Sequence, residues 1–213
     1  MKKILALLVL ASALPLAAQS FEAGVLYTWS PTKAQTLTVG PNSEEIKADT
    51  FKAAGVRFGY NFVSIGPMEF QGNATMQFNN SQDIGIKLNG TTVPSVGIKE
   101  DYKYWAVGAA VNWNFLVRLG VGLEYRSESL KLTDPIDGVN PSTTYGRGWI
   151  RGTAGFTIPA PIVKPFIGAE VAFPLSTKSL SLSDLSGTTP NWDNFNKSMA
   201  PKAQYGIYAG VRF

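Results

Sequence analysis

Eight stretches of about ten residues, each alternating between apolar and polar side chains, most constrain how this chain can fold. The stretch 67–78 is the clearest, because Met68 and Phe70 alternate there with Glu69 and Gln71. Alternation with a period of two places one set of side chains on each face of a β-strand. The eight stretches are 21–30, 51–62, 67–78, 102–115, 118–128, 145–158, 163–173 and 202–213.

The connections between these stretches alternate in length. Segments 63–66, 116–117 and 159–162 are tight turns, whereas the other four connections are long and polar. Short turns on one side and long loops on the other, joining an even number of strands, are typical of membrane-spanning barrels. The sequence therefore predicts an all-β fold, an eight-stranded antiparallel up-and-down transmembrane β-barrel. The long loops are 31–50, 79–101, 129–144 and 174–201.

The central positions of the apolar face carry no charge in any of the eight stretches, and strand charges such as Arg57 and Glu170 lie on the polar face. A Lys or Arg in contact with lipid at the bilayer midplane costs about 2 to 4 kcal/mol, so the apolar face must be the one that meets lipid. Eight strands enclose an interior that side chains can fill. We expect a network of lumenal charges, formed by Arg57, Glu69, Arg118, Glu124, Arg126, Glu128, Arg147, Arg151, Glu170 and Arg212. The network serves as a packed plug or, alternatively, lines a narrow gated water path.

The N-terminal residues 1–20 have the pattern of a cleavable signal peptide. Lys2 and Lys3 precede an apolar run over 4–14, and small residues follow it. The run is shorter than the ~20 residues that a membrane-spanning helix needs, which disfavours an uncleaved anchor. Cleavage after Ala18 or Ser20 fits equally well and leaves 21–213 as one barrel domain. The sequence has no Cys, so we expect no lipid attachment and no disulfide.

The last stretch carries an apolar face that ends in an aromatic residue, formed by Tyr205, Ile207, Ala209, Val211 and Phe213. Together with the signal peptide and the eight stretches, it makes the chain resemble the small eight-stranded bacterial outer-membrane barrels, such as the OmpA barrel domain, OmpX, the opacity proteins and PorT-like proteins. The resemblance implies a location in the bacterial outer membrane and contact with its lipid. It also implies that the barrel-assembly machinery recognises the C-terminal strand.

Family members similar to this chain are mostly structural barrels or use their external loops for adhesion. The resemblance thus implies a structural role or an extracellular ligand at the loops. Trp192 and Phe195, which we expect to be exposed in the loop 174–201, are the candidates for such a contact. Two alternatives stay open. The first is a small-solute pore, and the second, disfavoured by the polarity of the two faces, is a soluble lipocalin-like barrel that binds a ligand inside.

Several other classes of function are not expected. The sequence has no His, which the barrel enzymes that modify lipid A use as a base, so we predict that the chain is not an enzyme. Acidic residues in 134–137 and 184–193 lack the spacing of a calcium loop, and we expect no metal and no cofactor. With the two leader lysines removed from 19 basic residues, 17 face 15 acidic ones, and no basic cluster suggests nucleic acid.

Overall fold

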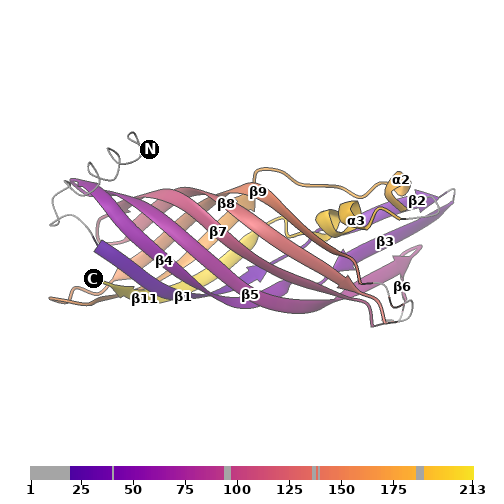
Figure 1. Cartoon of the computed structure of the whole chain (residues 1–213), viewed down its shortest axis with the longest axis horizontal. Coiled ribbons are helices and arrows are strands. Elements are labelled where there is room, and N and C mark those ends of the chain that lie inside the picture. Colours follow the sequence, from indigo (N-terminus) through magenta and orange to yellow (C-terminus); the bar gives the residue numbers. More distant parts are fainter. Residues whose placement is uncertain (1–19, 40, 94–96, 136–137, 139, 186–189) are drawn as a thin grey trace, which may run out of the picture.

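A computed structural model describes residues 20–39, 41–93, 97–135, 138, 140–185 and 190–213 as a long, closed β-barrel (Figure 1). Eight strands form the ring, each antiparallel to both neighbours, and the first strand closes against the last. These strands are β1 (Ser20–Ser30), β4 (Phe51–Ile65), β5 (Met68–Leu88), β7 (Lys99–Asn114), β8 (Arg118–Thr133), β9 (Ser142–Thr157), β10 (Lys164–Pro174) and β11 (Gln204–Arg212). The predicted fold class is confirmed. The predicted signal peptide lies outside the described residues, apart from Ser20.

The apolar face of every barrel strand points outward, as the charge pattern predicted. Phe58 and Leu123 each expose 59% of their surface, whereas Glu124, beside Leu123 in the chain, is buried inside. Exposed apolar side chains of this size and continuity indicate contact with a membrane. Large aromatic residues border the band at both ends, with Phe78, Trp105, Tyr125 and Phe173 toward the long connections and Phe62, Phe115, Phe156 and Phe213 toward the short turns.

Both described chain ends and the short turns lie at one end of the barrel, and the long connections lie at the other (Figure 1). In an outer-membrane barrel the short turns face the periplasm and the long connections face outward. We call these the periplasmic and the extracellular end. None of the helices within the described part of the chain is long and apolar enough to cross a membrane.

The strands continue farther toward the extracellular end than the sequence predicted. Segments that we expected to be loops instead contain the far ends of β5, β7 and β8 and three further strands, β2 (Gln35–Val39), β3 (Asn42–Ala48) and β6 (Thr91–Val93). The β2–β3 hairpin pairs with the far end of β5 and extends the barrel wall beyond the lipid-facing band (Figure 1).

A bulge in β5 explains why its extension was missed. The register between β5 and β7 shifts between Gln77 and Asn80, so the buried residues change from odd positions such as Gln77 to even ones such as Ile84. An extra residue in one strand reverses which face the following side chains occupy. The strict alternation therefore ends at the bulge although the strand continues to Leu88.

The predicted loop 174–201 also contains two helices, α2 (Leu182–Leu185) and α3 (Trp192–Met199). The side chain of Asn191 caps α3 by accepting a hydrogen bond from the backbone N–H of Asn194 at 3.0 Å. The two helices lie against the extracellular strands (Figure 1). We call the apolar cluster between them the cap core; it comprises Leu37, Ile46, Ala48, Phe51, Ile84, Tyr102, Tyr104, Ala106, Leu130, Leu132, Leu180, Phe195, Met199 and Ala200.

Candidate functional site

The lumen holds all six Arg residues of the sequence, and each forms an ion pair with a glutamate. The structure places all ten residues of the predicted network on the inner face of the barrel, on six different strands. The ion pairs group into three tiers along the barrel axis, which we call the periplasmic, central and outer tiers.

The periplasmic tier joins two arginines to two glutamates. Glu22 accepts hydrogen bonds from Arg118 and from Arg212, whose Nε lies 2.7 Å from Glu22 Oε1. Glu69 Oε2 lies 3.2 Å from Arg118 Nη2, and Gln71 Nε2 donates to Glu22 Oε2 at 2.8 Å. The sequence-based network omitted Glu22, although its position on the polar face of 21–30 carried the signal.

The central tier lies at mid-barrel. Arg57 Nη1 lies 2.5 Å from Glu170 Oε2, and Glu124 accepts from both Arg126 and Arg151, with Arg151 Nη1 2.9 Å from Glu124 Oε2. A carboxylate shared by two guanidinium groups is a strong, charge-assisted arrangement. The Arg57–Glu170 pair joins β4 to β10, and the Glu124–Arg151 pair joins β8 to β9.

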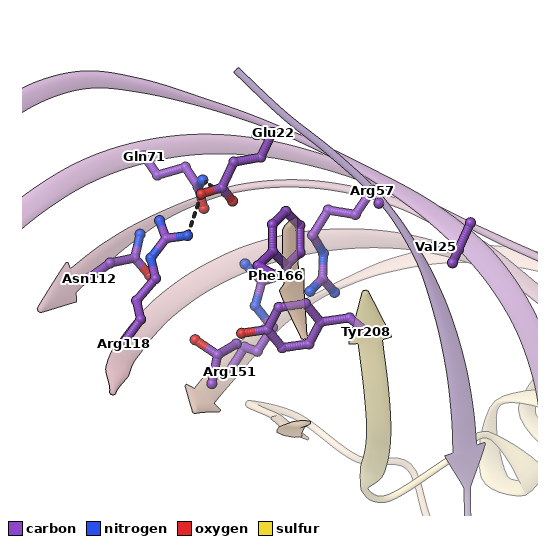
Figure 2. A pocket seen from close by; sticks show the side chains of 12 residues that line it. Glu22, Val25, Arg57, Gln71, Asn112, Arg118, Arg151, Phe166 and Tyr208 are labelled. Carbon is purple, nitrogen blue, oxygen red and sulfur yellow. Dashed lines mark hydrogen bonds and ion pairs between the residues drawn. The ribbon is translucent and has the colours of Figure 1, made fainter. Parts of the chain in front are cut away.

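A cavity of about 30 Å³ lies between the periplasmic and central tiers. Arg57, Arg118 and Arg151 line it together with the rings of Phe166 and Tyr208 (Figure 2). The Tyr208 ring passes directly over Gly168, where a side-chain Cβ would approach the ring to 2.5 Å. The glycine at this position is what allows Tyr208 to reach across the inner wall.

The outer tier closes the lumen toward the extracellular end. The Arg126 guanidinium stacks between Trp149, at 3.9 Å from the ring centroid, and Tyr104, at 4.3 Å. Arg147 Nε lies 2.5 Å from Glu128 Oε2, and the Tyr102 hydroxyl donates to Glu128 at 2.8 Å. Trp149, Arg126 and Glu128 have no exposed surface. Stacked aromatic and guanidinium planes of this kind fill the barrel cross-section.

Phe195, expected to be exposed, is instead buried in the cap core above the outer tier. Its exposed fraction is 6%, and Trp192 is half-buried with its ring 5.8 Å from that of Phe195. The expectation that Phe195 is exposed is therefore wrong, and Trp192 is exposed only in part. Helical spacing turns the two rings toward the barrel mouth, where burying them removes apolar surface from water.

Glu100 is a buried carboxyl that the sequence analysis did not single out. It lies in the part of β7 that extends beyond the lipid-facing band, five residues from Trp105, and it is fully buried next to the cap core. Neither of its carboxyl oxygens has a hydrogen-bond partner among the described residues. Burial raises the pKa of Glu100 well above its usual value, and the neighbouring Asp101 raises it further.

The residues of the predicted C-terminal signal lie on the outward face of the last strand. Tyr205, Ile207 and Phe213 are exposed toward lipid, and Ala209 and Val211 are half-buried between their neighbours. The backbone N–H of Phe213 donates to Phe21 O at 2.9 Å, so even the last residue is paired with the first strand.

The described residues contain no group of three or more His, Cys, Asp or Glu side chains arranged to hold a metal ion. Asp184, in one of the acidic segments considered for calcium, instead accepts from Ser181 N at 2.9 Å and from Asn194 Nδ2 at 2.6 Å. Its carboxylate thus ties α2 to α3.

No protein-family model matches the sequence, and no curated protein matches it. Among solved structures, Neisserial surface protein A is 12% identical over 92% of this chain and 96% of its own, with a TM-score of 0.50. This chain has the fold of the small eight-stranded outer-membrane barrels.

Another such barrel among the matches is Ail, the attachment invasion locus protein of Yersinia pestis. Its structure in complex with the heparin analogue sucrose octasulfate is 16% identical over 92% of this chain and 99% of its own, with a TM-score of 0.47. A second structure of Ail is similar to the same degree, with a TM-score of 0.45. The closed ring of eight strands and the match to Neisserial surface protein A confirm the fold that the sequence resemblance implied.

Proposed function

We propose that the chain is an integral protein of the bacterial outer membrane whose extracellular sheet makes contacts with other cells, surfaces or proteins. The observation that carries this proposal is the extension of the barrel wall beyond the lipid-facing band. The β2–β3 hairpin and the far ends of β5, β7 and β8 form this extension, and the cap core braces it from inside.

The outer face of the hairpin is the proposed contact surface. Thr36, Thr38 and Lys47 are exposed there, whereas Leu37 and Ile46 on the opposite face are buried in the cap core. A rigid sheet loses little conformational entropy when it binds a partner, which favours its use as a contact surface. Trp192 and Phe195 are not part of this surface, because they pack inward.

The proposal also includes lipid and the assembly machinery as partners. The outward belt of apolar side chains supports contact with outer-membrane lipid. The outward face of β11, with Phe213 at its end, supports recognition by the barrel-assembly machinery. Two measurements test the membrane setting: an unheated sample on a detergent gel should migrate faster than a boiled one, and the refolded protein should float with lipid vesicles.

A small-solute pore is the competing function. The stacked Arg126 and the cap core fill the path toward the extracellular end, so we expect no conductance steps when the refolded protein is added to a planar bilayer. Reproducible single-channel steps would favour the pore over the closed contact barrel.

Adhesion is tested by displaying the full chain on bacteria and measuring attachment to epithelial monolayers and to immobilised extracellular-matrix proteins. The variant Thr36→Glu/Thr38→Glu places two charges on the hairpin face and should abolish the attachment that the chain confers. The control Thr177→Glu/Ser179→Glu adds the same charges at exposed positions after β10 and should attach normally. Equal attachment of both variants, or none above cells that lack the chain, would leave only the structural role.

A further inference from the structure

The cavity between the periplasmic and central tiers is a built polar site that the proposed contact function does not use. Its volume of about 30 Å³ has room for roughly two water-sized particles. Asn112, which lines it, is buried, and Arg57 and Arg118 extend into it from opposite walls (Figure 2).

The charges of the three lumenal tiers do not balance. The periplasmic tier has two arginines and two glutamates, and Arg147 pairs with Glu128 in the outer tier. The remaining lumenal charges are Arg57, Arg126 and Arg151 against Glu124 and Glu170. One positive charge therefore has no carboxylate of its own. A buried charge without a counter-charge is unfavourable in a low-dielectric interior.

The hydrogen bonds around the cavity are unbalanced in the same direction. Arg57 Nη2, Asn112 Nδ2 and Arg118 Nε are buried and have no hydrogen-bond partner among the described residues. All three are donors, and all three belong to residues that line this cavity. Buried donors are rarely left without an acceptor, so the space between them favours a particle that accepts several hydrogen bonds at once.

We infer that this cavity binds a small monovalent anion of about the size of chloride. Such an ion accepts from Arg57, Arg118 and Asn112 and supplies the missing negative charge. Glu22, the carboxylate on the cavity wall, already accepts from Arg118, Arg212 and Gln71, which reduces its repulsion of the ion. Water satisfies the donors as well but leaves the positive charge unbalanced, and this difference separates the two occupants.

The cavity lies next to the periplasmic end of the lumen, and Arg118 separates it from that end. Arg118 also lines a second, more open cavity of about 190 Å³ together with Glu69, Asn114 and Arg212. The stacked Arg126 closes the opposite direction. Entry past Arg118 from the periplasmic side would load the anion site without conductance across the membrane.

The site is tested by the chloride dependence of unfolding. The full chain is refolded in detergent micelles and unfolded with urea in sodium chloride or in sodium gluconate, whose anion is too large for the cavity, at equal ionic strength. A ligand that binds only the folded state raises its stability with concentration. We expect the wild-type midpoint to rise saturably with chloride and not with gluconate.

The variant Asn112→Asp places a permanent negative charge beside Arg118 and should lose the chloride-dependent part of the midpoint shift. The control Asn140→Asp adds the same charge in the connection between β8 and β9, where Asn140 is exposed. This control should keep the chloride-dependent part of the midpoint shift. An identical chloride response in both variants would overturn the inference.

Crystals of the wild type grown in bromide give an independent measurement that does not depend on folding of a variant. An anomalous peak between Arg57, Arg118 and Asn112 supports the site. Density for water alone in this cavity, at saturating bromide, would reject it.

Discussion

The lumen and the cap core bury side chains of similar size but are held together by different forces. In the lumen, ion pairs and guanidinium stacks fill the space, as between Arg126, Glu124 and Trp149. In the cap core, aliphatic and aromatic residues such as Phe195 and Met199 pack without ion pairs among them. The difference follows from the surroundings, because the barrel wall turns its apolar face to lipid and leaves polar side chains for the inside, whereas the cap lies in water.

The charged residue types follow the same division. All six Arg residues lie in the lumen, whereas the extracellular surface carries Lys, including Lys47, Lys87 and Lys131. Arg presents a planar fork that can bind a carboxylate with two bonds and stack on a ring, and Lys is a strongly hydrated point charge. The lumen therefore uses Arg where water is scarce, and the surface uses Lys where water is abundant.

Removing a lumenal carboxylate should lower the free energy of unfolding most. Glu124→Gln leaves Arg126 and Arg151 without their shared counter-charge, and we expect it to lower the free energy of unfolding by about 3 to 5 kcal/mol, measured by urea titration of the refolded barrel. The matched control is Glu45→Gln, which breaks the exposed pair with Lys87 and should cost at most about 1 kcal/mol. Equal losses in the two variants would contradict the difference drawn between buried and exposed pairs.

Shortening a side chain in the cap core should lower stability less, and it should destabilise the cap without destabilising the barrel. Met199 is fully buried, and Met199→Ala should destabilise the cap by about 2 to 4 kcal/mol through lost packing. Hydrogen exchange of α3 should accelerate while the heat-modifiable migration of the barrel stays unchanged. Loss of the migration shift would show that the cap and the barrel fold as one unit.

Exchanging Arg for Lys tests the division of residue types. Arg147→Lys keeps the charge but removes the fork that bonds Glu128 and Pro201 O, so we expect a loss of about 2 kcal/mol in unfolding free energy. The reverse exchange at the surface, Lys131→Arg, should stay within about 0.5 kcal/mol of the wild type. Equal values for the two exchanges would remove the argument for Arg inside the lumen.

Replacing Glu100 should change the free energy of unfolding very little at acid pH, and the change should grow as the pH rises. Because its pKa is higher in the folded than in the unfolded state, the folded state binds the proton more tightly, and stability falls as the pH rises above the unfolded value. Glu100→Gln should match the wild type near pH 4 and exceed it increasingly toward pH 8, by at most about 1.4 kcal/mol per pH unit. Urea unfolding midpoints of the two proteins between pH 4 and pH 8 check this prediction. A constant difference between the two proteins across this pH range would contradict it.

The sequence was sufficient to predict the barrel wall because lipid imposes a strict rule on each strand. A one-residue slip would move Arg57 or Glu170 into lipid, so the inner face could be assigned residue by residue. The sequence could not show which charged residues pair with one another across the lumen, because Glu22 and Arg212 meet only when the barrel closes. The extension of β5 was missed because its bulge reverses the alternation after Gln77.

The cap was the least predictable part. Its apolar residues are dispersed among Ser, Asn and Asp and come from segments far apart in the chain, so no single stretch shows a core. One signal was present, since Trp192, Phe195 and Met199 recur at the three- and four-residue spacing of a helix face. That spacing predicts burial and argues against the exposed contact that we expected in the loop 174–201.

The closure of β1 against β11 makes the two ends of the chain partners. Glu22 and Arg212 lie 190 positions apart along the chain yet share a hydrogen bond. This bond can form only after β11 has joined the barrel. Contacts between such distant residues carry a large loop-closure entropy and slow the search for the native state. Every intermediate in which β11 is not yet paired retains two unpaired strand edges, which favours protection by a chaperone until this strand has joined the barrel.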